Sequence, residues 1–348
     1  MKPTTLVVTT VHWPDDTRIR ERLLRSLQDD FTVRYATRAP GPSDRSGFEW
    51  VELRGGRIRR NLSALRLSLR SSWDVLVVHD PELVPTALLA RAMTRRPVVL
   101  DVHENVPATA FTRSWVPNPV RRPMAAALRL LLRVAESRLQ LTLAEPGYRS
   151  LFRGEHPVFP NYPDTSGYPE PAPGDGSVVY LGDVTRQRGA GVAVEAAVIH
   201  GEPMEFIGRV SDELRSDLTA VLAGRGRVEF LGQVPNPLAL ERVRTAGVGI
   251  SPLLDLPNYR DSMPTKILEY LALGIPVVAS DLPGTRRLVS DLDAVELVAP
   301  GDPAALAAGV RRALSPSARD AALRQAPAIR EQFRWPGDDV ALFYRSLV

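Results

Sequence analysis

A lysine and a glutamate three residues apart form the strongest chemical signal in this chain. Lys266 and Glu269 lie in the segment 258–281, whose sequence is NYRDSMPTKILEYLALGIPVVASD. The signals for a short helix and its two ends are Ser262, Pro264, Thr265, Gly274 and Pro276. Residues three apart project from one side of a helix, and near its N-terminus the backbone N–H groups and the positive dipole end attract anions. The segment therefore predicts a phosphate-binding helix followed by a buried strand.

The use of lysine and the position of a second cation support a diphosphate ligand. Only two of the 44 basic residues are lysines, Lys2 and Lys266, and the others are arginines. Arg188 and Gly189 lie in the first loop of the second half, and in a doubly wound domain this loop shares the carboxyl edge of the sheet with the Lys266 helix. A guanidinium, an ammonium and a helix N-terminus would then meet on one diphosphate, so no metal is expected. The alternative for Lys266 and Glu269 is a surface ion pair worth ~0 to 1 kcal/mol.

Polar residues also follow apolar runs in the first half of the chain. The clusters are His12 with Asp15 and Asp16, then His79 with Asp80, then Asp101 with His103 and Glu104. Parallel strands end at the same edge of a sheet, and ligands of doubly wound sheets bind beyond these carboxyl ends. The three clusters therefore predict a second group of site residues.

Alternating apolar runs and amphipathic stretches predict an α/β fold with two doubly wound, Rossmann-like domains facing a central cleft. Buried strands are expected at residues 5–10, 31–36, 49–53, 73–79 and 97–101, and helices at residues 61–70, 85–93, 121–139 and 302–314. Another helix is expected to begin at Asp16 or Thr17. The expected organisation is an acceptor-binding domain at residues 1–160, a proline-rich link at 161–176, a donor-binding domain at 177–330 and a C-terminal helix at 331–348 that packs on a domain surface.

Composition excludes several classes of function. The chain has 348 residues, 44% apolar content and no cysteine, which removes disulfides, thiol nucleophiles and cysteine-bound metals and fits a reducing cytoplasm. No GxGxxG or GxxxxGK[ST] loop is present, and Asp291 with Asp293 is interpreted as a turn. No signal peptide or spanning segment is expected. The net charge of +4 is spread among 40 acids, so nucleic acid is not an expected partner.

The basic amphipathic helix at residues 121–139 has two interpretations. It could contact an anionic membrane surface, which would place the protein peripherally at the inner face of the membrane. It could equally pack on its own domain.

Five sequence segments together resemble the retaining GT-B glycosyltransferases of the family 4 type. The second half contains YLGDVTRQRG, PTKILEYLALGIPVVASDLPGTRRLV and VAPGDPAALAAGV, which are similar to the donor half of these enzymes. The first half contains VHDPELVPTALLA and VVLDVHENVP, which are similar to the HDPELL…DVHE pattern of a bacterial polysaccharide and natural-product branch. The resemblance covers nearly the whole chain in the right order. It implies transfer of a sugar from a nucleoside diphosphate to a hydroxyl acceptor, with retention and without a further cofactor.

The resemblance also implies roles for individual residues. The donor-binding candidates are Arg186, Arg188, Gly189, Thr265, Lys266 and Glu269, with Glu269 on the ribose and the basic residues on the diphosphate. The catalytic candidates are His103, beside the donor sugar, and Asp261, which stands where the family has a glutamate. The acceptor-side candidates are His12, Arg18, His79, Asp80 and Glu104. A histidine that only satisfies backbone groups at a strand end is the alternative for His103.

Two further residues depart from the family pattern. Asp183 stands where an arginine is usual, with Arg186 as a substitute, and Arg287 replaces a glutamate after the late glycine. Two alternative functions follow for a chain of this shape. A nucleotide-sugar epimerase would convert the donor without an acceptor, and a non-catalytic partner subunit would keep the fold without activity.

Overall fold

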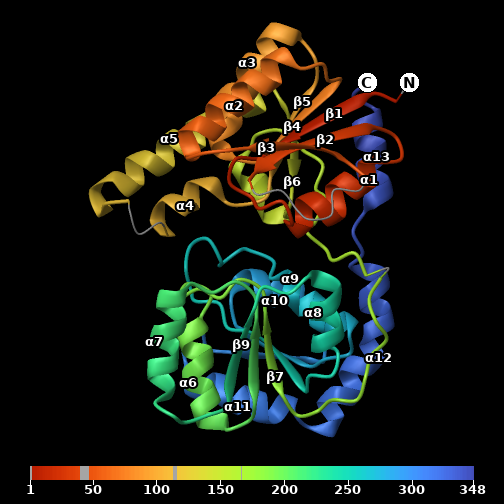
Figure 1. Ribbon diagram of the computed structural model, residues 1–348. Coiled ribbons are helices and arrows are strands. Elements are labelled where there is room, and N and C mark those ends of the chain that lie inside the picture. Colours follow the sequence, from red (N-terminus) through yellow and green to blue (C-terminus); the bar gives the residue numbers. More distant parts are fainter. Residues whose placement is uncertain (1, 40–46, 113–115, 166) are drawn as a thin grey trace. The chain divides into compact units, whose positions relative to one another are not determined.

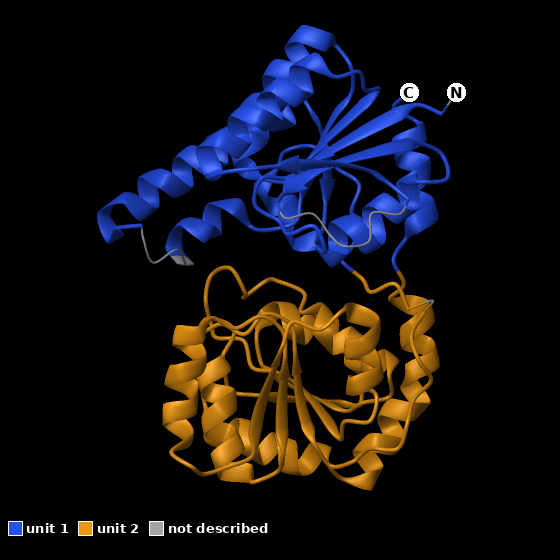
Figure 2. Ribbon diagram, in the orientation of Figure 1, with its two compact units in different colours: residues 1–161, 335–348 blue, residues 162–334 orange. Residues whose placement is uncertain are grey.

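Two compact units make up the chain (Figure 1, Figure 2). The computed structural model describes residues 2–39, 47–112, 116–165 and 167–348. The first unit contains residues 1–161 and 335–348, and the second contains residues 162–334. The proline-rich segment expected to link two domains therefore lies almost entirely in the second unit, where Tyr162 and Tyr168 pack against the core.

The first unit is built on a six-stranded sheet in the order β3-β2-β1-β4-β5-β6. The strands are β1 (Thr4–Val8), β2 (Thr32–Arg38), β3 (Glu49–Leu53), β4 (Val75–Val78), β5 (Val98–Val102) and β6 (Gln140–Leu143). All neighbours are parallel, and the central strands are apolar, β-branched runs buried on both faces, as parallel sheets require. Because β1 lies between β2 and β4, the strand order reverses there, and the carboxyl ends of β1, β4 and β5 are adjacent.

Helices cover both faces of this sheet. They are η1 (Thr17–Leu24), α1 (Arg25–Leu27), α2 (Arg57–Arg70), η2 (Pro81–Leu83), α3 (Val84–Thr94), α4 (Val106–Thr112), α5 (Asn118–Glu136), η3 (Pro146–Leu151) and α13 (Gly337–Arg345). Helices α2, α3 and α5 share a core with Leu6 and Val8, whereas η1 and α13 share the opposite core with Val7. The C-terminal helix thus packs on the first unit. No helix formed by the described residues is long and apolar enough to cross a bilayer.

The second unit repeats this design with a parallel sheet in the order β12-β11-β10-β7-β8-β9. Its strands are β7 (Val178–Leu181), β8 (Met204–Ile207), β9 (Val228–Gly232), β10 (Val248–Ser251), β11 (Val277–Ser280) and β12 (Val295–Val298). Its helices are α6 (Ala190–His200), α7 (Asp212–Leu222), α8 (Asn236–Val243), α9 (Thr265–Ala272), α10 (Pro283–Leu288), α11 (Pro303–Ala313) and α12 (Pro316–Gln332). The order reverses beside β7, which places the loop after β7 at the expected binding edge. The predicted α/β fold is confirmed.

Candidate active site

Lys266 is a buried cation without a hydrogen-bond partner in the second unit. Only 9% of the residue is exposed, and Nζ donates no hydrogen bond to any described residue. The ammonium instead lies over the ring of Tyr180, 3.6 Å from the ring centroid. Burial, followed by the nearby charge of Arg188, lowers the pKa of Lys266 well below its usual value. An unpaired ammonium in such a position is poised to gain an anionic ligand.

Arg188 and Lys266 converge on Gly182, the glycine that follows β7. A Cβ atom built on Gly182 would lie 3.9 Å from a guanidinium nitrogen of Arg188 and 3.9 Å from Nζ of Lys266. Close backbone packing holds this loop, because a Cβ on Gly189 would lie 1.8 Å from the carbonyl oxygen of Pro252 after β10. The predicted meeting of an ammonium and a guanidinium at this sheet edge is therefore seen in the structure.

Helix α9 begins without a side-chain cap. Its N-cap is Pro264, and no side chain accepts a hydrogen bond from its first turn. The expectation that Ser262 or Thr265 caps the helix is wrong: Ser262 donates to the carbonyl of Tyr259, and Thr265 is the first helical residue. The N–H groups of this turn are therefore free of side-chain acceptors, which suits an anion-binding helix start.

Glu269 lies further along α9, half-buried, and its charge favours the protonated form of Lys266. The end of the helix is as expected, since Gly274 follows it with φ of +68°. The structure thus places Lys266, Glu269, Thr265, Arg188 and Gly189 on two neighbouring segments of one unit.

Arg186 and Asp183 are engaged with other residues. Arg186 pairs with Asp217 on α7, and Asp183 pairs with Arg209 at 3.0 Å. Arg209 follows Gly208 at the end of β8, and sequence analysis missed it although a strand followed by Gly-Arg was its signal. These side chains border a pocket of about 610 Å³ at the ends of β7 and β8, lined by Asp183, Val184, Thr185, Arg186, Gln187, Arg209, Val210, Ser211, Glu213 and Leu214.

Two departures from the family pattern form one ion pair. Arg287 donates to Asp261 at 2.7 Å, and both side chains are exposed. Gly284, the late glycine, lies in the first turn of α10 and packs on the backbone of the Asp261 loop: its Cβ would come within 2.5 Å of the carbonyl oxygen of Ser262. The lack of a side chain at this glycine thus allows a close approach to the protein's own backbone.

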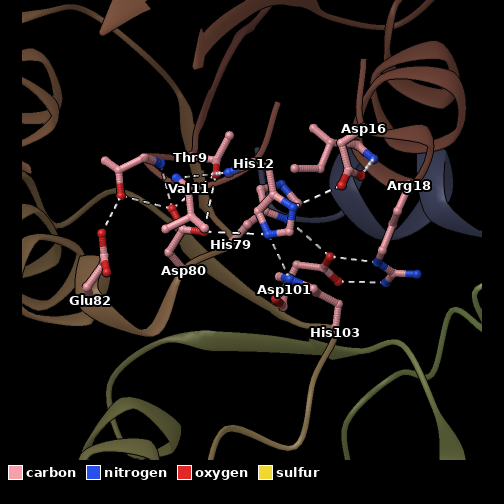
Figure 3. Close-up of polar contacts among 12 residues, drawn as sticks. Thr9, Val11, His12, Asp16, Arg18, His79, Asp80, Glu82, Asp101 and His103 are labelled. Carbon is pink, nitrogen blue, oxygen red and sulfur yellow. Dashed lines mark hydrogen bonds and ion pairs between the residues drawn. The ribbon is translucent and has the colours of Figure 1, made fainter. Parts of the chain in front are cut away.

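In the first unit, His12 and His103 face each other across the ends of β1 and β5 (Figure 3). Their Nε2 atoms are 2.9 Å apart, so one proton lies between them. His12 Nδ1 lies 2.9 Å from Asp16, and His103 Nδ1 lies 3.1 Å from the carbonyl oxygen of Asp101. These contacts define a doubly protonated His12 that donates to a neutral His103 whose proton is on Nδ1.

The electrostatic surroundings favour the same assignment. Burial alone would lower the pKa of His12, but the bond to Asp16 and the charges of Asp16, Asp80 and Glu104 raise it to about 9. Burial and the positive charge of His12 lower the pKa of His103. At neutral pH the pair therefore carries a single positive charge, located on His12.

Asp80 lies just after β4 and binds the loop that follows β1. Its carboxylate accepts hydrogen bonds from the hydroxyls of Thr9 and Thr10 and from the backbone N–H of Thr10, and it lies 3.6 Å from His12 Nε2. Asp80 is buried and fully engaged, so it positions the loop that carries His12 (Figure 3).

Arg18 and Asp101 form a buried, bidentate ion pair beneath the histidines. The guanidinium donates to both oxygens of Asp101 at 2.9 and 2.8 Å, and Thr142 donates to one of them at 2.9 Å. His79 is also buried, with Nδ1 3.2 Å from Asp101. Arg18 and His79 are therefore buried in the network that supports His103, while Glu104 is half-buried beside it.

One group of the described residues has the composition of a metal site. His79, Asp101 and His103 offer ligand atoms within 4.8 Å of one another. However, Arg18 and Thr142 already occupy the oxygens of Asp101, and the guanidinium would repel a cation. These residues fit a hydrogen-bond network better than a metal centre.

Known proteins resemble this chain both in sequence and in fold. Residues 176–316 match the family of glycosyl transferases group 1. Together with the fold and the relatives below, this match supports a GT-B glycosyltransferase. Among curated members, it is 28% identical to the phosphatidyl-myo-inositol mannosyltransferase of Mycolicibacterium smegmatis over 254 residues, covering 68% of this chain and 61% of the relative. It is 31% identical over 180 residues to the D-inositol 3-phosphate glycosyltransferase of Acidothermus cellulolyticus, covering 47% and 39%. The chain thus spans less than two thirds of the length of these relatives.

Solved GT-B structures match the whole chain. The sucrose-phosphate synthase of Thermosynechococcus elongatus superposes with a TM-score of 0.77 at 16% identity, covering 100% of this chain and 99% of that one. Anabaena Alr3699/HepE, solved with UDP and glucose, gives a TM-score of 0.77 at 14% identity and covers 99% and 98%. At these identities the likeness concerns the fold.

Proposed function

We propose that the protein is a retaining glycosyltransferase that moves a sugar from a nucleoside diphosphate to a hydroxyl acceptor without a metal ion. The observation that carries the proposal is the unpartnered ammonium of Lys266, buried beside Arg188 at the uncapped start of α9. Two cations and free backbone N–H groups supply the charge that other enzymes obtain from a metal. The UDP and glucose bound by HepE, which shares the fold, support a nucleotide-sugar donor.

The proposed chemistry follows from where charge develops. As the bond from the sugar to the diphosphate breaks, its electron pair passes to the phosphate oxygen, which Lys266 and Arg188 stabilise. The acceptor oxygen forms the new bond on the same face, and its proton leaves with the diphosphate. Glu269 is proposed to hold the ribose hydroxyls, with Thr265 offering a backbone N–H group. Gly189, whose own N–H donates to the carbonyl oxygen of Arg186, lets the loop pack closely on Pro252. No protein nucleophile is needed.

The proposed roles in the first unit concern the sugar and the acceptor. The neutral His103 is held through Nδ1 by the carbonyl oxygen of Asp101. A sugar hydroxyl that displaces His12 from Nε2 can therefore donate a hydrogen bond to an uncharged imidazole. His12, His79, Asp80, Arg18 and Glu104 are proposed to shape or support the acceptor side. The acceptor is a hydroxyl-bearing natural product or envelope glycan.

A donor screen and a product analysis test this function. Calorimetry with UDP, GDP, TDP and ADP should reveal one preferred nucleotide, and the matching nucleotide-sugars should raise the melting temperature because they bind only the folded protein. The anomeric coupling of the product by NMR then distinguishes retention from inversion, and turnover in EDTA tests the need for metal. Binding of none of the four nucleotides would refute the donor site, and turnover of donor without acceptor would indicate an epimerase.

A further inference from the structure

Helices α2, α3 and α5 form a continuous layer on one face of the first unit. Helix α3 packs against α2 on one side and α5 on the other (Figure 1). Their inward residues, such as Ala64, Ala87 and Leu132, fill the core beneath. Their outward residues form a surface, the α2-α3-α5 face.

Exposed apolar side chains are concentrated on this face. Seven of the sixteen large hydrophobic residues exposed among the described residues lie on these three helices. They are Ile58 and Leu62 on α2, Leu89 and Met93 on α3, and Val120, Leu130 and Val134 on α5, with exposures from 42% to 79%. Each helix therefore contributes apolar side chains that its own core does not bury, which indicates a surface that binds something apolar.

The charge of the same face is of one sign. Helices α2 and α3 contain no carboxylate, and the single carboxylate of α5, Glu136, is engaged with Arg133 and His156. Exposed arginines stand among the apolar residues: Arg59, Arg66 and Arg70 on α2, and Arg122 and Arg129 on α5. None of these five forms an ion pair with a described residue, whereas Arg242, Arg286 and Arg312 on the second unit each pair with a carboxylate.

The pattern along each helix sets the two kinds of side chain next to each other. On α2, Ile58, Leu62, Arg66 and Arg70 are spaced four apart and form one stripe. On α5, Leu130 and Val134 are four apart, and Arg122 and Arg129 flank their stripe on one side. Arginine can bury its alkyl stem beside apolar groups while its guanidinium stays at a polar surface.

We propose that the α2-α3-α5 face docks on an anionic lipid bilayer. Arginines that have no carboxylate partner bind lipid phosphates, and the apolar side chains between them enter the boundary with the acyl chains. A nucleic acid or an acidic protein surface would account for the arginines but not for Met93, Leu130 and Ile58. The face extends one of the two interpretations of the α5 helix, contact with an anionic membrane, to three helices, and it does not depend on the proposed donor site.

Sedimentation with vesicles tests the charge requirement. Wild-type protein should bind equimolar phosphatidylcholine and phosphatidylglycerol vesicles at low salt and should bind phosphatidylcholine alone much more weakly. The triple variant Arg66→Gln, Arg122→Gln, Arg129→Gln should lower the partition coefficient by roughly a hundredfold, at about fivefold for each arginine. The matched control is Arg215→Gln, Arg225→Gln, Arg227→Gln, which removes the same charge from exposed arginines of the second unit and should leave binding nearly unchanged.

A second pair of variants tests the apolar requirement. Met93→Gln with Leu130→Gln should reduce vesicle binding severalfold, whereas Leu238→Gln with Leu342→Gln, at equally exposed positions elsewhere, should not. Equal losses in face and control variants, or no binding by the wild type, would overturn the proposal. Binding to heparin as tight as to anionic vesicles, with no effect of Met93→Gln and Leu130→Gln, would indicate a soluble polyanion instead. Nucleotide calorimetry on the same variants keeps this outcome separate from failure of the donor site.

Discussion

Replacing Lys266 by methionine should make the second unit more stable and the donor site weaker. Methionine keeps the aliphatic stem of the lysine and removes the ammonium. A lysine whose pKa is lowered by folding destabilises the folded state at every pH below the pKa that it has in the unfolded chain. This destabilisation is lost only as the pH rises to that unfolded-state pKa. At neutral pH the wild type therefore carries this cost, and the variant does not.

The expected size follows from two opposing contacts of the ammonium. A buried polar group without a partner costs about 1–3 kcal/mol. The contact of the ammonium with the Tyr180 ring offsets about 0.5–2 kcal/mol of this cost. The net gain on removal is about 1 kcal/mol, or roughly 2–4 °C in melting temperature for a unit of this size. Loss of a charge-assisted contact with the diphosphate, about 1.5–3 kcal/mol, should raise the nucleotide Kd by roughly ten- to a hundredfold.

Differential scanning calorimetry measures the first effect, and titration calorimetry with the preferred nucleotide measures the second. Lys2→Met is the matched control, because Lys2 is the other lysine and, among the described residues, its ammonium donates only to the exposed carbonyl of Gln28. This control should change neither quantity. A Lys266→Met protein that melts lower and binds nucleotide as tightly as the wild type would refute the reasoning, because it would show that Lys266 is only structural.

Three further predictions concern ion pairs and the histidine pair. The raised pKa of His12 stabilises the fold fully below pH 6.5, and this contribution, roughly 1–3 kcal/mol, should be lost as the pH rises to about 9; melting curves of His12→Gln should lack this loss. Arg18→Met leaves the buried carboxylate of Asp101 unpaired and should cost about 3–5 kcal/mol in urea unfolding, with partial recovery when Asp101→Asn is added. Arg287→Ala breaks an exposed pair, so its unfolding free energy should stay within about 1 kcal/mol of the wild type, while a fall in kcat/KM would tie Asp261 to the sugar.

Much of the fold and several residues at the sheet edges of both units were predictable, because the strongest sequence signals are local. Buried β-branched runs marked the central strands, and the polar clusters after β1, β4 and β5 met because adjacent parallel strands end together. Asp16 was confirmed as a cap, since its carboxylate accepts from the N–H of Ile19 as local spacing suggests.

The remaining features depend on partners that are distant in sequence. Asp101 takes Arg18 as its partner across 83 positions, and His103 meets His12 across 91, so neither contact leaves a local pattern. Local propensity also misplaced the start of α9: Ser262 is a good cap by type, but Gly284 packs on its carbonyl and fixes the loop in another conformation. Arg209 was missed because its role requires the ends of β7 and β8 to be adjacent.

The interleaving of the two units along the chain has a consequence for synthesis on the ribosome. The second unit is continuous, so it can fold as soon as residue 334 has emerged. The first unit begins earlier but finishes later, because Trp335, Val340 and Tyr344 complete the core beneath η1. Until those residues arrive, Ile19, Leu23 and Val7 have an uncovered apolar surface, which makes the nascent first unit the segment most in need of a chaperone.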